Sequence, residues 1–262
     1  GISVVNALSD RVEVTVRRDG QVYDIAFERG EKVQELTITG TCGRRNTGTR
    51  VRFWPQASYF DSPKFSVTKL EHLLKAKAVL CPGLTIKFLD KNTGIKLEWC
   101  YEDGLKDYLI DAVKQFTCLP EQPFVGAFST DQSAVDWALC WLPEGGECLA
   151  ESYVNLIPTA LGGTHVNGLR QGLLDAMREF CEFRNLLPRG VKLTPEDIWD
   201  RCAYILSVKM QDPQFAGQTK ERLSSRQSSA FVSGVVKDAF SLYLNSNTEL
   251  AEQIAEICIS SA

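Results

Sequence analysis

The sequence predicts an α+β protein of two domains, because antiparallel strand patterns and helical patterns occupy separate stretches of the chain. Residues 12–55 alternate apolar and polar side chains between short turns, which is typical of an antiparallel sheet with one buried face. A second strand series, over residues 124–156, leads into long helical patterns. The composition changes near Glu102–Gly104, and 262 residues suffice for two domains. We therefore expect domains at residues 1–102 and 103–262.

In the first domain we expect a short helix, four strands, a second helix and a hairpin. The helix over residues 1–8 rests on a short apolar stripe, and Asp19–Gly20 is a hairpin-turn signal. Ser66 can cap a helix over residues 66–79. The expected strands are residues 12–18, 22–27, 35–39, 48–55, 84–89 and 95–101.

The second domain is expected to begin with a helix over residues 105–116. Three strands and a loop over residues 157–165 then lead into a long helix with a clear apolar stripe. Thr194 and Pro195, followed by two acids, predict the start of a short helix. The expected strands are residues 124–128, 134–142, 148–156 and 203–208. Two helical patterns, from residue 229 and again after residue 247, complete the chain.

The charge and hydropathy of the chain restrict the classes of function. Its hydrophobic fraction of 44% and charged fraction of 24% are typical of a globular protein in water. The formal net charge of −4 argues against a basic surface over the whole chain, so any DNA contact is expected to be local. No apolar run reaches the roughly 18 residues of a membrane span, and no signal-peptide pattern is present.

The nine cysteines and two histidines show no metal-binding spacing. No C-x-x-C pair occurs, so we expect no zinc site and no other metal site in these residues. Most of the cysteines lie in apolar runs, which predicts reduced, buried thiols in a cytosolic protein. The chain begins at Gly1 rather than methionine and enters a helical pattern at once, so we expect it to be a fragment.

A polar loop over residues 212–223 carries the most distinctive side chains. Gln218, Thr219 and Lys220 place an amide, a hydroxyl and an ammonium group on successive residues, after Gly217. These donors suit phosphate oxygens, with lysine as a point charge. Local composition alone favours a solvated polar loop, and only a resemblance over the whole chain gives more weight to phosphate binding.

Four motifs carry that resemblance. Gly1–Ser9 resembles the end of the phosphate-binding motif of the GHKL ATPases, and Asn46–Pro55 resembles their TGT strand. Ile157–His165, with its Gly-Gly-Thr-His end, and Asp212–Lys220 resemble the transducer domain of type IIA topoisomerase B subunits. The motifs span the chain in the family's order. Two further stretches, residues 74–83 and 169–180, resemble the bacterial topoisomerase IV branch more than the gyrase branch.

The resemblance implies the C-terminal part of a GHKL (Bergerat) ATPase sandwich in residues 1–102 and a ribosomal S5 domain 2-like transducer domain in residues 103–262. It also implies ATP as the ligand. Gly1 and Ile2 are expected to close the backbone cradle around its phosphates. Lys220 is expected to reach the γ-phosphate and stabilise the transition state, supported by Gln218.

Three other residues have a competing structural explanation. Thr49 matches the position that binds the adenine edge, although an ordinary strand threonine fits almost as well. Arg18 matches the mouth of the pocket near bound aminocoumarin inhibitors, but on its own it fits a solvated arginine at a strand end. His165 is expected to cap or pack a helix, because nothing selects one of nine cysteines as its nucleophilic partner.

The family's glutamate base and its Mg²⁺-binding asparagine have no counterpart here, so we expect the fragment alone not to hydrolyse ATP. The implied whole protein is an ATP-hydrolysing topoisomerase in the bacterial cytoplasm, associated with the nucleoid. Its expected partners are the A subunit of topoisomerase IV, DNA and a second copy through the ATPase gate, with no membrane. The alternatives are a gyrase B subunit fragment, a non-catalytic structural transducer module, or another GHKL protein such as a mismatch-repair or chaperone relative.

Overall fold

The computed structural model describes residues 1–262, and nearly all of the predicted helices and strands are present in the predicted order. The chain forms two compact units, Gly1–Leu70 and Glu71–Ala262, which we call the first and second units. Their border lies before the predicted domain boundary at residues 102/103, which stays a prediction. None of the helices combines the length and the hydropathy required to cross a membrane.

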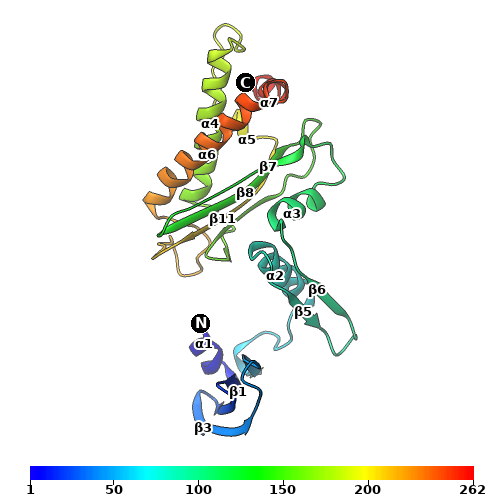
Figure 1. The fold of residues 1–262 in the computed structure, drawn as a ribbon, viewed down its shortest axis with the longest axis vertical. Coiled ribbons are helices and arrows are strands. Elements are labelled where there is room, and N and C mark those ends of the chain that lie inside the picture. Colours follow the sequence, from blue (N-terminus) through cyan, green and yellow to red (C-terminus); the bar gives the residue numbers. More distant parts are fainter. The chain divides into compact units, whose positions relative to one another are not determined.

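The first unit is built on a four-stranded antiparallel sheet in the order β3-β2-β1-β4. Asp19 and Gly20 both have positive φ values, 54° and 78°, as the predicted two-residue hairpin turn requires. The short helix α1 precedes the sheet (Figure 1). The elements are α1 (Ile2–Ala7), β1 (Ser9–Arg18), β2 (Gln21–Glu28), β3 (Glu31–Thr41), β4 (Gly48–Pro55) and the 3₁₀ turn η1 (Ala57–Tyr59).

The prediction that one face of this sheet is buried is wrong for these residues. Val12 and Ala26 are the buried apolar residues of the sheet, whereas Leu36, Ile38 and Val51 are exposed. The reason is a lack of covering layers within the unit: α1 has six residues, buries none of them, and lies at the Phe53–Pro55 end of β4. Within residues 1–262, an apolar face of this sheet is therefore left uncovered.

The second unit is built on a five-stranded mixed sheet in the order β10-β9-β11-β8-β7, in which only β11 and β9 pair in parallel. Strand β10 falls in the stretch that the sequence predicts to be a loop. The strands are β7 (Leu119–Ser129), β8 (Ser133–Trp141), β9 (Ala150–Val154), β10 (Ile157–Pro158) and β11 (Cys202–Met210), besides a separate hairpin of β5 (Ile86–Leu89) and β6 (Lys96–Trp99).

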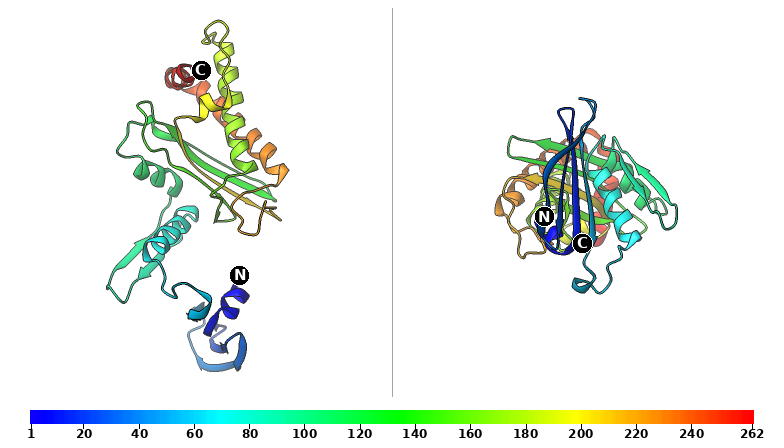
Figure 2. Two further views of the ribbon diagram at one scale, coloured as in Figure 1. Left: turned by 180° about the vertical axis from the view of Figure 1, so that it is seen from behind. Right: turned by 90° about the horizontal axis from the view of Figure 1, so that it is seen from below.

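Helices cover both faces of this sheet (Figures 1 and 2). Along β8, Trp137, Leu139 and Trp141 join a core with the C-terminal helices, while Ala138 and Cys140 join a second core with α2 and α3. This burial on both sides explains the nearly continuous apolar run of β8. The helices are α2 (Val67–Leu80), α3 (Gly104–Ala112), α4 (Thr164–Phe183), α5 (Pro195–Trp199), α6 (Arg226–Ser246) and α7 (Thr248–Ser261).

Helices α4 and α6 approach each other so closely that glycine is required between them. A Cβ atom on Gly168 would lie 2.6 Å from the carbonyl oxygen of Ser229, and one on Gly172 would lie 2.7 Å from that of Ser233. This contact holds the start of α6 against α4. It therefore restrains the C-terminal end of the loop that carries Lys220.

The predicted burial of the thiols holds for four of the nine cysteines. All nine are free thiols, and the buried ones are Cys140, Cys181, Cys202 and Cys258. Burial raises the pKa of the Cys181 thiol to about 11, which keeps it protonated near neutral pH. Cys100 and Cys148 are exposed, and both lie outside helices and strands.

Candidate functional site

Residues 211–225, the Lys220 loop, join β11 to α6 and fold back on themselves. The N–H of Ala216 donates to the carbonyl of Arg222 at 3.0 Å, and the N–H of Ser224 donates to the carbonyl of Gln214 at 2.8 Å. These two hydrogen bonds close the base of the loop. The tip, residues 217–221, extends beyond them and is exposed.

The predicted phosphate-binding residues lie together on this tip. Gln218 and Lys220 are both exposed, and the Lys220 ammonium group makes no ion pair. Lys220 has a positive φ of 59°, a strained conformation for a residue with a side chain, and its N–H donates to the carbonyl of Gly217 at 3.3 Å. The tip thus presents a positive charge without a partner, which suits an anionic ligand.

The base of the Lys220 loop is anchored by Leu223, which is 1% exposed. The N–H of Leu223 donates to the carbonyl of Gly162 at 3.1 Å, and its carbonyl accepts the N–H of Thr164 at 3.1 Å. Gly163, between them, has a φ of 137°, and a Cβ atom there would lie 2.3 Å from the carbonyl oxygen of Leu223. Two glycines before α4 therefore allow the two backbones to touch.

Ser225 forms a second anchor. Its buried hydroxyl accepts the N–H of Gln214 at 2.8 Å, and its carbonyl accepts the Thr164 hydroxyl at 2.6 Å. None of the positioning residues Leu223, Ser225 and Thr164 was predicted from the sequence. The only sequence signal for this anchoring was that the Gly-Gly-Thr-His motif and the Gln-Thr-Lys motif are both rich in turn-forming and polar residues.

His165 is fully buried near the same anchor. Its Nε2 lies 3.0 Å from the Thr159 hydroxyl, which in turn lies 2.7 Å from the Ser152 hydroxyl. Burial lowers the pKa of His165 to about 4, so the ring is neutral at pH 7. The expected packing role is confirmed, but the side chain caps no helix, since the N-cap of α4 is Gly163.

This buried histidine predicts an acid-sensitive fold. The folded-state pKa of about 4 lies below the unfolded value of 6.5, so the unfolded chain takes up the proton first. Stability is complete above pH 6.5 and falls as the pH drops towards 4, by about 2 kcal/mol between pH 7 and 5. Urea unfolding at both pH values measures the loss.

Variants assign this loss to His165. His165→Asn is expected to lower the free energy of unfolding at pH 7. It is also expected to reduce the difference in this free energy between pH 7 and pH 5 by about 2 kcal/mol. The matched control is His72→Asn, because the His72 side chain is 63% exposed. An unchanged pH dependence in His165→Asn would show that other groups cause the acid sensitivity.

The predicted ATP-binding residues of the first unit are Gly1, Ile2 and Thr49, and they lie towards opposite ends of the sheet. Gly1 is the N-cap of α1 and its carbonyl accepts the Val4 N–H at 3.0 Å, while Ile2 is exposed. Thr49 is exposed on β4 opposite Val16, on the apolar face, at the end away from Phe53–Pro55. The start of the chain and Thr49 therefore lie towards different ends of β4.

Arg18 lies at the end of β1 beside the Asp19–Gly20 turn. Its side chain is 78% exposed and pairs with Asp19 at 3.7 Å. This geometry suits a solvated arginine at a strand end. The predicted position near an inhibitor stays a prediction.

Each unit by itself offers features that suit a part of an ATP molecule. Lys220 offers an unpaired positive charge for a phosphate, the first amides of α1 have no partner within the helix, and the open apolar face beside Thr49 suits a flat ring. No group of three or more His, Cys, Asp or Glu side chains is placed to hold a metal ion. The predicted Mg²⁺ therefore has no cluster of ligands within residues 1–262.

Comparison with known proteins agrees with the motifs. The family DNA gyrase B matches residues 104–262. The B subunit of DNA topoisomerase 4 from Salmonella typhimurium is 74% identical over 262 residues, and that from Escherichia coli is 73% identical. Both alignments cover 100% of this chain but 42% of the relative, so the chain spans less than half of these proteins.

Solved structures show the same fold. The ATP-binding domain of topoisomerase IV from Francisella tularensis, in complex with a small-molecule inhibitor, superimposes with a TM-score of 0.88 at 44% identity, covering 99% of this chain and 71% of that one. The ATPase domain of Thermus thermophilus gyrase B, in complex with an aminocoumarin, gives 0.83 at 29% identity, with coverages of 99% and 70%.

These matches confirm the predicted α+β fold class and favour the topoisomerase IV branch over the gyrase branch, since identity to the topoisomerase IV relatives is much higher. They also remove the mismatch-repair and chaperone alternatives. The chain belongs to the DNA gyrase B family, the B subunits of type IIA DNA topoisomerases, and is similar over its whole length to the topoisomerase IV member of that family.

Proposed function

We propose that this chain is the nucleotide-sensing and transducing part of a topoisomerase IV B subunit, which uses ATP to drive decatenation and relaxation of DNA. The observation that carries the proposal is the Lys220 loop, whose base is fixed by Leu223 and Gly163 and whose tip exposes an unpaired ammonium group. A fixed base with an exposed charge is the arrangement required of a sensor for an anionic group.

Five residues would hold ATP. Gly1 and Ile2 donate backbone amides to its phosphates, and Thr49 binds the adenine edge. Lys220 neutralises the negative charge that develops on the terminal phosphate, and Gln218 orients a phosphate oxygen or the attacking water. ATP supplies the terminal phosphate and the free energy of its hydrolysis. The general base and most Mg²⁺ ligands belong to parts of the protein outside these residues.

The role of Lys220 in coupling follows from its charge. Its contact with the terminal phosphate exists before hydrolysis and is lost afterwards, so the contact favours one arrangement of the protein over another. In the whole protein this switch closes and reopens a dimeric gate over a DNA segment. The A subunit of topoisomerase IV is the expected partner, DNA is the substrate, and the bacterial cytoplasm, at the nucleoid, is the expected location.

Nucleotide titration and DNA assays test this proposal. The whole B subunit is expected to bind a non-hydrolysable ATP analogue and, with the A subunit, to unlink catenated DNA circles only when ATP is present. The 262-residue chain alone is expected to show no ATP turnover above background at micromolar concentration. Decatenation that proceeds equally well without ATP would contradict the proposal.

A further inference from the structure

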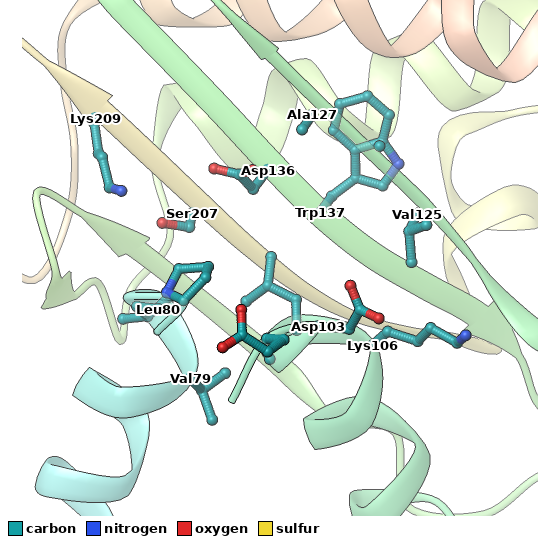
Figure 3. Close-up of a pocket in the computed structure, with 15 residues that line it drawn as sticks. Val79, Leu80, Asp103, Lys106, Val125, Ala127, Asp136, Trp137, Ser207 and Lys209 are labelled. Carbon is teal, nitrogen blue, oxygen red and sulfur yellow. The ribbon is translucent and has the colours of Figure 1, made fainter. Parts of the chain in front are cut away.

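One cavity of the second unit (Figure 3) is lined by none of the residues of the Lys220 loop. It has a volume of about 470 Å³, within the range of small-molecule sites. Its floor is formed by β7, β8 and β11 on the face that packs against α3. Its wall is formed by the C-terminal end of α2 and by residues 102–106, which lead into α3.

Two polar side chains on the floor have no partner. Asp136 on β8 and Ser207 on β11 are directly opposite each other in the strand register, so they are neighbours on one face. Ser207 is 3% exposed and its hydroxyl makes no hydrogen bond. The flanking Leu206 and Val208 belong to the core on the opposite face, so Ser207 faces the cavity.

The lack of hydrogen-bond partners for these two groups within the protein is unfavourable. A buried polar group without a hydrogen-bond partner lowers stability, and the loss is larger when the group is charged. Asp136 is half-buried and its side chain makes neither a hydrogen bond nor an ion pair; burial raises the pKa of its carboxyl group. A ligand that donates hydrogen bonds to both groups would remove this cost.

Apolar side chains also line the cavity. Leu80 and Pro82 lie on one side, and Val125, which is 48% exposed, lies on the floor near the opening. Such side chains suit the hydrocarbon body of a ligand rather than a hydrated ion. The ligand therefore needs an apolar part in addition to its hydrogen-bond donor.

The charges around the cavity favour a cation. Glu102, Asp103 and Asp136 oppose Lys106 and Lys209, which leaves a net charge of −1 among the lining residues. None of the five makes an ion pair. Asp136 lies at the centre of the floor beside Ser207, while Lys209 is exposed (Figure 3). An anion would meet this carboxylate, and a metal ion would find no cluster of three ligands.

We propose that this cavity binds a small organic cation, an ammonium group on an apolar body, with the ammonium donating to Asp136 and Ser207 and the body packing against Leu80, Pro82 and Val125. The proposal is independent of the function proposed for Lys220. The expected ligand chemistry is that of an aralkylamine or a similar amphiphilic amine.

Titration of the full chain with three matched probes tests the charge preference. The probes are 2-phenylethylammonium, neutral 2-phenylethanol and anionic 3-phenylpropionate, followed by amide NMR shifts of residues lining the cavity. The cation is expected to bind saturably and at least about tenfold more tightly than the others, a difference of about 1.4 kcal/mol. No saturable binding of the cation, or equal binding of all three probes, would overturn the proposal.

Variants locate the site. Asp136→Asn is nearly isosteric and is expected to abolish the preference for the cation. Ala127→Trp places a large side chain opposite Asp136, at an exposed position that tolerates it, and is expected to block the binding of all three probes. The matched control is Asp238→Asn on α6, an exposed carboxylate outside the cavity, which is expected to change nothing. Binding of the cation that survives both Asp136→Asn and Ala127→Trp, in variants with unchanged thermal unfolding, would place it elsewhere and refute the assignment.

Discussion

Lys220→Ala in the whole B subunit is expected to lower kcat for ATP hydrolysis by about 100- to 1,000-fold, the range found when a single transition-state donor is removed. Lys220 is the exposed and unpaired charge at the tip of its loop, so its removal leaves the developing charge on the terminal phosphate without this neutralising group. Stability is expected to change little, because the side chain is exposed and makes no ion pair. Steady-state ATPase kinetics and urea unfolding measure the two effects.

Lys192→Ala is the matched control for this prediction. Lys192 is also a lysine outside helices and strands in the second unit, and it is exposed. It is expected to leave kcat within about twofold of the wild type, since surface substitutions away from a site have small effects. If Lys220→Ala hydrolyses ATP and drives decatenation at the wild-type rate, Lys220 has no role in catalysis.

Gly163→Ala is expected to destabilise the second unit by roughly 2 to 4 kcal/mol and to displace the Lys220 loop. The φ of 137° is unfavourable for alanine, and the added Cβ atom would lie 2.3 Å from the carbonyl oxygen and 2.5 Å from the nitrogen of Leu223. Backbone atoms cannot move aside as a flexible side chain can. The hydrogen bonds of Leu223 to Gly162 and Thr164 must therefore lengthen or break.

Gly217→Ala provides the control within the same loop. Gly217 has no atom within 4 Å of an added Cβ and has no positive φ, so alanine there is expected to be neutral or slightly stabilising. Urea unfolding of the chain and ATPase assays of the whole protein compare the two variants. Equal stability of Gly163→Ala and the wild type would show that the close approach to Leu223 does not hold the loop.

Where sequence reasoning was accurate, the signals were local. The Asp19–Gly20 turn needs two residues with positive φ, and this pair accepts them. The capping box of α5 involves Thr194 and Asp197, three residues apart, and the structure contains both of its hydrogen bonds. The loop around Gln218 and Lys220 was expected to be polar and is exposed, while phosphate binding by these residues stays a prediction.

Where the sequence reasoning failed, the deciding contacts join distant residues. Alternation within the strands of the first sheet predicts an apolar face. It does not show whether other helices or strands cover that face, and within residues 1–262 they do not. The anchoring of the Lys220 loop likewise depends on Leu223 meeting Gly162 and Thr164, which lie about 60 residues earlier in the chain.

The amino-acid order alone was sufficient to predict the helices, all strands except β10, the fold class and the exposed charged loop, because turn chemistry and hydrophobic periodicity act over a few residues. The way in which that loop is held required the folded chain. Leu223 meets Gly163 although the two are far apart in the sequence, and the unpaired Ser207 and Asp136 become neighbours only through strand pairing. Such contacts depend on the register of strands and the packing of helices, which no single stretch of sequence specifies.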